Sequence, residues 1–174
     1  GLTLNHEQLE NIQRRYVKAN RNFRRDYLQE SQAERREKTV KRALERAETV
    51  YGKLDASKRQ WLEQKIAASP FDPELWQAER IRRQQDVQQV LRGMQQRPPP
   101  SKDQAMAAVR AQYQRVVYSP SERYRTYSQQ LTAYNCEFAA QLHNRTTPAQ
   151  RKTAVEKFRG WESDLRSLMA GNGG

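Results

Sequence analysis

Apolar residues recur at every third or fourth position over most of this chain. The first such run is Leu9, Ile12, Tyr16, Ala19, Phe23 and Tyr27. Steps of three and four place side chains on one face of an α-helix. No stretch alternates apolar and polar residues with the period of two that a β-strand requires. The pattern therefore predicts an all-α fold: an elongated helical bundle of about seven helices, with no strands.

Residues that begin and end helices divide the chain into these segments. Sequences that favour a helix start, with Ser, Thr, Asp or Asn at the cap, occur at Asn5, Ser31, Asp55, Asp72, Ser101, Ser119 and Thr147. Gly52 follows the second run and is a natural residue for a helix C-terminus. Ser31 either begins a new helix or lies inside one long helix.

The three consecutive prolines, Pro98 to Pro100, form the one obvious linker, which we expect to be stiff and extended. The predicted organisation is an N-terminal helical segment over residues 1–97, a Pro-rich linker over 98–101, and a three-helix segment over 102–170. The last segment is expected to pack on the first, and the alternative is one continuous domain.

Composition adds a strong positive charge to this picture. Lys and Arg number 32 against 20 Asp and Glu, so the net charge is +12, and the mean hydropathy is -1.13. Such a charge favours polyanionic partners, namely nucleic acid, anionic lipid headgroups or an acidic protein. The 8 Tyr, 4 Phe and 3 Trp residues provide enough apolar anchors to argue against disorder.

The first predicted helix carries the best candidate for anion binding. Arg14, Lys18, Arg21 and Arg25 are spaced four, three and four apart. At 100° per residue they form one stripe roughly opposite the apolar face. This stripe could lie along a phosphate backbone, a lipopolysaccharide or a phospholipid surface. The plainer interpretation is a solvated helix face that keeps the protein in solution.

The sequence offers no candidate catalytic residue, metal ligand or small-molecule cofactor site. His6 and His143 are the only histidines, and neither has the neighbours of a zinc motif. His6 is expected to be exposed in a first turn, and His143 to lie near a helix end. Cys136 shares a helix face with Ala133 and Ala140, which predicts a buried, inert thiol. The chain is therefore interpreted as a non-enzyme.

Two resemblances bear on location and role. The segments 41–54, 68–76 and 134–151 resemble an uncharacterised family of proteobacterial periplasmic lipoproteins. That family carries a lipobox cysteine and a helical region upstream, so the resemblance implies a C-terminal portion of a lipid-anchored periplasmic protein and no particular activity. The helix starts at Leu2-Thr3, Leu54-Asp55 and Thr146-Thr147 are loosely similar to those of the Spy and CpxP helical stress chaperones.

The leading hypothesis is thus a periplasmic helical lipoprotein that binds an envelope protein, an unfolded client or an anionic envelope component. The alternative is a basic helical protein that binds nucleic acid, although no helix-turn-helix or zinc pattern supports it. Aromatic residues at helical spacing are expected to form a core. Their functional interpretation is an apolar surface for unfolded clients, as in the periplasmic chaperones.

Overall fold

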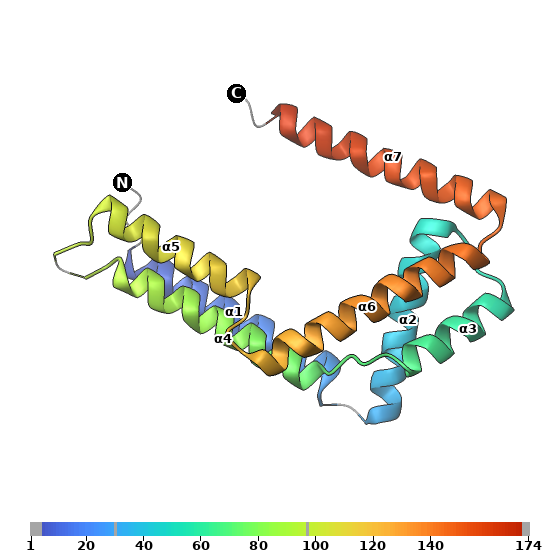
Figure 1. Ribbon diagram of the computed structural model, residues 1–174, viewed down its shortest axis with the longest axis horizontal. Coiled ribbons are helices and arrows are strands. Elements are labelled where there is room, and N and C mark those ends of the chain that lie inside the picture. The colour runs from blue at the N-terminus through green and yellow to red at the C-terminus, as the bar shows by residue number, and fades with distance from the viewer. Residues whose placement is uncertain (1–4, 30, 97, 172–174) are drawn as a thin grey trace. The chain divides into compact units, whose positions relative to one another are not determined.

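The structure, a computed structural model, describes residues 5–29, 31–96 and 98–171. These residues form seven α-helices and no strand (Figure 1), which confirms the predicted all-α class. The helices are α1 (His6–Tyr27), α2 (Gln32–Tyr51), α3 (Ala56–Ala67), α4 (Pro73–Gly93), α5 (Lys102–Val117), α6 (Glu122–Arg145) and α7 (Pro148–Gly171). Leu2 and Thr3 of the chaperone-like pattern lie outside the described residues.

Most helices begin where the capping residues predict. The Asn5 side chain accepts a hydrogen bond from the Gln8 amide at 2.8 Å, and the Asn5 amide donates to the Gln8 side chain at 2.9 Å. Ser101 forms the same reciprocal arrangement, and Asp55 and Asp72 each cap a helix with one carboxylate oxygen. Such caps satisfy amides that have no partner within the helix.

The structure determines two helix boundaries that the sequence did not. α1 ends at Tyr27 and α2 begins at Gln32, so Ser31 precedes a new helix rather than lying inside a long one. α6 begins two residues later than Ser119 would suggest, because the Ser121 hydroxyl accepts the Tyr124 amide at 3.2 Å. Ser119 is instead buried, and its hydroxyl accepts the Ser121 amide.

The described chain divides into two compact units, and each unit combines two segments that are distant in sequence. Unit 1 contains the residues up to Ser31 together with Phe71–Leu131, and unit 2 contains Gln32–Pro70 together with the residues from Thr132 onward. The predicted Pro-rich linker falls inside unit 1 rather than between units. The reason is that α5 returns to α4: the Arg115 guanidinium contacts the Asp86 carboxylate at 2.7 Å.

Unit 1 is organised around α4, against which both α1 and α5 pack. Phe23 of α1 is buried and stacks on Trp76 of α4, with 4.9 Å between ring centroids. Glu79 of α4 is also buried, and its carboxylate accepts hydrogen bonds from Arg82 and Arg83 at 2.8–2.9 Å. The aromatic stack and the ion-pair cluster thus both lie on the central helix of unit 1.

Unit 2 contains the larger apolar core. Ala47, Leu54, Leu62 and Leu142 are buried there, and Leu62 is fully inaccessible to solvent. Trp61 and Phe138 pack against this core with their rings stacked 5.6 Å apart. Trp61 and Phe138 thus belong to a core, as their helical spacing predicts.

Candidate functional site

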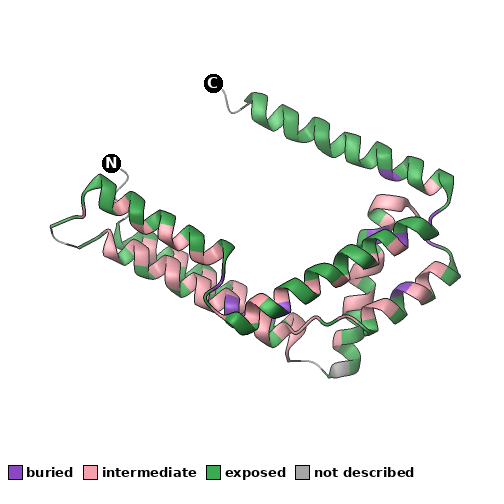
Figure 2. Ribbon diagram, in the orientation of Figure 1, coloured by how far each residue is buried: buried purple, intermediate pink, exposed green. Residues whose placement is uncertain are grey.

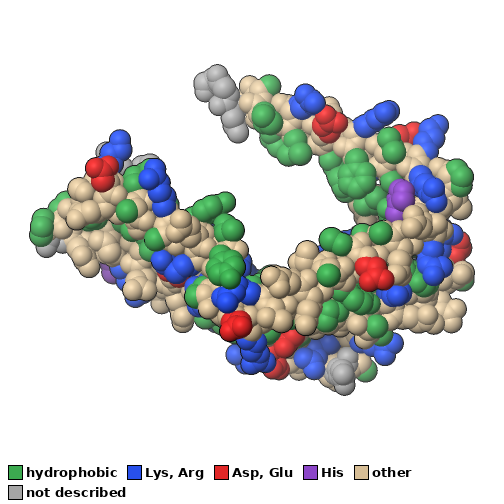
Figure 3. Space-filling view, in the orientation of Figure 1, with side chains coloured by type: hydrophobic (Ala, Val, Ile, Leu, Met, Phe, Trp, Pro, Cys, Tyr) green, Lys and Arg blue, Asp and Glu red, His purple; other side chains and the backbone are tan. Residues whose placement is uncertain are grey.

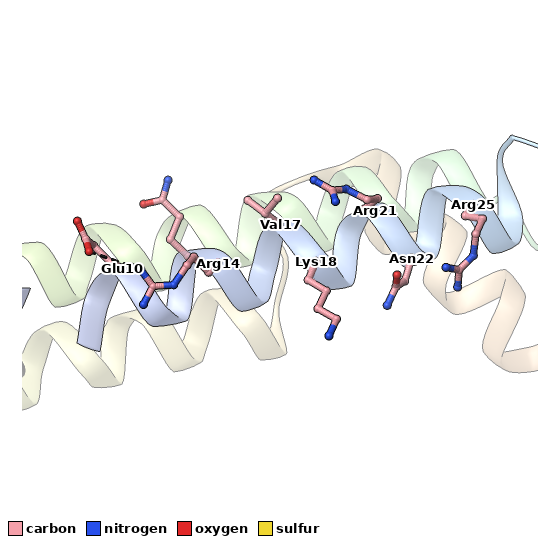
Figure 4. Close-up of a pocket in the computed structure, with 8 residues that line it drawn as sticks. Glu10, Arg14, Val17, Lys18, Arg21, Asn22 and Arg25 are labelled. Carbon is pink, nitrogen blue, oxygen red and sulfur yellow. Dashed lines mark ion pairs between the residues drawn. The ribbon is translucent and has the colours of Figure 1, made fainter. Parts of the chain in front are cut away.

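The basic stripe, comprising Arg14, Lys18, Arg21 and Arg25, lies along α1 as predicted. All four side chains are exposed (Figure 4). The opposite side of the helix carries Phe23, whose ring stacks on Tyr27 at 4.6 Å as well as on Trp76. The cations therefore project away from the interface between α1 and α4.

Polar contacts to α4 fix the rotation of α1 about its own axis. The Asn20 amide donates to the Gln84 side-chain oxygen at 2.7 Å, and the Gln84 amide donates back to the Asn20 oxygen at 3.1 Å. The buried Gln77 side chain donates to the Asn20 backbone carbonyl at 3.3 Å. Because these bonds and the Phe23 stack act on the same side, the basic stripe keeps one orientation relative to unit 1.

The charges of the basic stripe are not equally available. Arg14 contacts the Glu10 carboxylate at 3.6 Å, and Arg25 contacts Asp26 at 2.8 Å. Among the described residues, Lys18 and Arg21 have no ion-pair partner within 4.0 Å. The two ends of the basic stripe are therefore partly neutralised, and its centre is open.

A shallow depression follows the basic stripe along the helix. Its lining consists of Glu10, Gln13, Arg14, Val17, Lys18, Arg21, Asn22 and Arg25. Every one of these residues belongs to α1, so no second element forms an opposing wall. The depression is consequently an open surface between splayed side chains, suited to a flat or extended ligand rather than to an enclosed small molecule.

A second kind of surface, which is apolar, lies on α5, where the sequence favours a core and leaves an exposed apolar surface as the alternative. The apolar face of α5 consists of Met106, Val109, Tyr113 and Val117, whose exposed fractions are 46%, 47%, 65% and 67%. The other side of the helix carries Arg115, which joins Asp86 of α4, and its carbonyl accepts a hydrogen bond from Arg82 at 3.1 Å. α5 is therefore attached to α4 through polar groups, while its apolar side is turned to solvent.

α7 is exposed over almost its whole length (Figure 2), and it presents a longer apolar face than α5. Its members are Val155, Phe158, Trp161, Leu165, Leu168 and Met169, with exposed fractions from 39% to 79%. Phe158 and Trp161 contact each other edge to face, with centroids 5.3 Å apart, and Lys157 lies over the Trp161 ring. Only Ala154, near the start of the helix, is buried. In Figure 3, hydrophobic side chains gather on the visible side of α7.

Both apolar faces were expected to be core. The spacing of Phe158, Trp161, Leu165 and Leu168 is as regular as that of a core helix. Spacing shows which residues share a face, but it does not show whether another element covers that face. One feature of the sequence does point to exposed faces: the hydrophobic content is only 36%. Few apolar side chains on other helices are then left to cover the faces of α5 and α7.

The predicted burial of Cys136 is wrong. The thiol is exposed, and so are Ala133 and Ala140, which share its helix face. The large side chains on the opposite face, Tyr134 and Phe138, make the contacts of α6 in unit 2, since Tyr134 donates to the Lys65 carbonyl. A face of small residues allows close approach, but among the residues that the structure describes no helix covers this one.

The histidines lie where the sequence places them. His6 is exposed in the first turn of α1 and contacts Glu10 at 3.3 Å. His143 lies near the end of α6, where its Nδ1 atom is 3.1 Å from the Tyr51 hydroxyl. Within the described ranges, no group of three or more His, Cys, Asp or Glu side chains could hold a metal ion. None of the described helices is both long and apolar enough to cross a bilayer.

Comparison with known proteins identifies no relative of this chain. No family model, no curated protein and no solved structure matches the chain. What defines the protein is therefore its class, an all-α chain, together with two kinds of exposed surface: a basic stripe on α1 and apolar faces on α5 and α7.

Proposed function

We propose that this chain is the helical part of a periplasmic lipoprotein that binds non-native polypeptide and does not catalyse a reaction. The single observation that carries the binding role is the exposed apolar face of α7, together with the smaller one of α5. The periplasmic location and the lipid anchor rest on the resemblance of residues 41–54, 68–76 and 134–151 to proteobacterial lipoproteins. The loose similarity to Spy and CpxP chaperones points in the same direction.

The amount of exposed apolar surface supports this role. With side chains of about 150–250 Å² each, the exposed fractions on α7 correspond to on the order of 600 Å². Monomers rarely expose a contiguous apolar patch larger than that, and patches of this size commonly bind a partner.

The residue types on the two apolar faces favour binding of clients with many different sequences over binding of one fixed partner. Met106 and Met169 have flexible and polarisable side chains, and they belong to the same two apolar faces as Tyr113, Phe158 and Trp161. Binding surfaces that accept many sequences use such side chains because they can repack around different ligands. The net charge of +12 further attracts acidic chains before contact.

The test is suppression of aggregation. A heat-denatured model enzyme is followed by light scattering in the presence of the wild-type protein or of the double variant Leu165→Asp, Leu168→Asp. We expect the variant to bind the client roughly tenfold or more weakly, because each buried Leu contributes about 1.5–3 kcal/mol. The matched control is Ser163→Asp with Ser167→Asp, which adds the same charge to the polar side of α7 and should suppress aggregation like the wild type.

Circular dichroism of each variant checks that the helical content is unchanged. Equal suppression by the Leu and Ser variants would contradict a role for the apolar face of α7. A wild-type protein that does not slow aggregation would overturn the client-binding proposal and favour a folded envelope protein as the partner.

A further inference from the structure

The centre of the basic stripe is a concentrated and open positive charge that client binding does not use. From Arg14 to Arg25, with both ends included, the chain has six Lys or Arg residues and no Asp or Glu. At 1.5 Å per residue, this segment of α1 is about 17 Å long. Because acidic partners engage the two ends, Lys18 and Arg21 are the two members of the basic stripe that an external anion reaches without displacing a carboxylate.

The orientation of these cations is set before any ligand arrives. The Phe23–Trp76 stack and the paired amides of Asn20 and Gln84 hold the opposite side of α1 against α4. A fixed row of charges loses less conformational entropy on binding than charges on a mobile segment. Only the side chains themselves must then be ordered.

The shape and composition of the surface select the type of anion. The lining residues all belong to α1, so the row is an open surface without opposing walls, which suits contact with a broad surface. Val17 is 51% exposed within this row, and it projects to the same side of α1 as Arg21, whereas Lys18 projects to the other side (Figure 4). An apolar side chain between cations fits the boundary between lipid headgroups and acyl chains, where long basic side chains keep their charge among the phosphates.

The same surface is less suited to nucleic acid. Proteins that hold single strands stack the bases on exposed aromatic rings. The aromatic residues of α1 are Tyr16, Phe23 and Tyr27, and they lie on the side opposite the basic stripe, none of them exposed. A duplex would contact the cations through its phosphates alone and would leave Val17 against a polar backbone.

We propose that the basic stripe of α1 binds the phosphate headgroups of an anionic lipid surface, with Lys18 and Arg21 at the centre of the contact. The contact is peripheral, with α1 lying along the surface and its opposite side still packed on α4. It concerns a different helix from the client-binding faces, so either role can fail without the other.

The experiment is sedimentation of the full chain with vesicles made of equal amounts of phosphatidylcholine and phosphatidylglycerol, or of phosphatidylcholine alone. We expect the wild type to bind only the anionic vesicles and to dissociate as salt is raised. The double variant Lys18→Glu, Arg21→Glu should bind at least about tenfold more weakly, since each cation near an anionic membrane contributes severalfold to affinity. Lys18→Arg should bind like the wild type.

The matched control is Arg110→Glu with Arg123→Glu, which makes the same change in net charge at exposed positions of unit 1. We expect it to retain most of the vesicle binding. An equal loss in both double variants would mean that net charge, not the basic stripe, drives binding, and would overturn the proposal.

A duplex is tested in parallel at the same salt concentrations. Tighter binding to the duplex than to anionic vesicles, abolished by Lys18→Glu and Arg21→Glu, would overturn the proposal in favour of nucleic acid. Aggregation assays are performed without lipid, and the Lys18→Glu, Arg21→Glu variant should still suppress aggregation. Loss of suppression in the apolar variant of α7, with vesicle binding intact, separates the two proposals.

Discussion

Glu79 shows how a single residue of unit 1 combines burial with charge. Its side chain is only 3% exposed, and burial by itself raises the pKa of the carboxyl group. Hydrogen bonds from Arg82, Arg83 and Ser119 outweigh that effect, so the net pKa is lowered from its ordinary value of 4.5. The native state therefore holds the ionised form more strongly than the unfolded chain does.

We expect Glu79→Gln to reduce the free energy of unfolding by about 2 kcal/mol, because two guanidinium groups lose a buried ionic partner. The measurement is urea unfolding followed by circular dichroism. The control is Glu162→Gln on α7, where the carboxylate and its partner Arg166 are 59% and 77% exposed. That change should stay within about 0.5 kcal/mol, as exposed ion pairs contribute little.

The lowered pKa of Glu79 also sets the direction in which its contribution to stability changes with pH. Below pH 4.5 the unfolded chain takes up the Glu79 proton before the native state does. Stability contributed by Glu79 is thus present above that pH and is lost as the pH falls toward the lowered native pKa. Glu79→Gln should flatten this part of the profile, and an unchanged slope would contradict the role given to Glu79.

Sequence reasoning could not find this cluster. The spacing of Glu79 to Arg82 and Arg83, three and four residues apart, is equally typical of an exposed helix surface. It became a buried cluster because α5 returns to α4 beside it, and that contact is not encoded in the local spacing. The predicted burial of Cys136 fails for a related reason, because a face of small residues does not by itself imply a neighbouring helix.

At the scale of whole helices, the sequence predicts where elements begin better than what they contact. The caps at Asn5, Asp55 and Asp72 act through residues three positions away, so their effect is local and readable. Whether a helix face is covered depends on other elements. The apolar residues of α2 and α3 meet in a core, whereas those of α5 and α7 remain exposed.

This difference predicts that a Leu→Ala substitution lowers the free energy of unfolding far more on α3 than on α7. Leu62 on α3 is fully buried, so Leu62→Ala should cost about 2–5 kcal/mol through lost burial and the cavity left behind. Leu165 on α7 is 62% exposed, so Leu165→Ala should change stability by no more than about 0.5 kcal/mol. Urea unfolding of the two variants measures both values. A loss at Leu165 as large as that at Leu62 would mean that the apolar face of α7 is covered in solution.

At the scale of the whole chain, the two compact units should respond separately to damage. Trp76 of α4 stacks on Phe23 in unit 1, and Trp61 of α3 stacks on Phe138 in unit 2. Each is therefore a fluorescent reporter of its own unit. We expect Leu62→Ala to lower the unfolding midpoint reported by Trp61 more than the midpoint reported by Trp76.

The measurement uses variants that retain one tryptophan at a time, with Phe at the other two positions. The parent variants without Leu62→Ala provide the control for the Trp replacements themselves. Identical shifts at both reporters would show that the chain unfolds as one cooperative unit, against the separation into two.

The division into units was beyond reach of sequence reasoning. Pro98 to Pro100 is the strongest local break in the chain, and it suggested a boundary there. The structure instead places these prolines in the connection between two helices that pack together, α4 and α5. Local composition identifies a stiff connector, but only the contacts of distant segments reveal which helices it connects.

The interleaving of the two units has a consequence for biosynthesis. Helices α2 and α3 leave the ribosome well before α6 and α7, yet Leu142 of α6 completes the core that Leu54 and Leu62 begin. During translation the apolar side chains of these early helices stay uncovered while the 75 residues from Ala68 to Leu142 are still being made. For the same reason, cutting the gene at any single point cannot yield either unit as an intact fragment. Isolating one unit would require two pieces to be expressed together or rejoined in a new order.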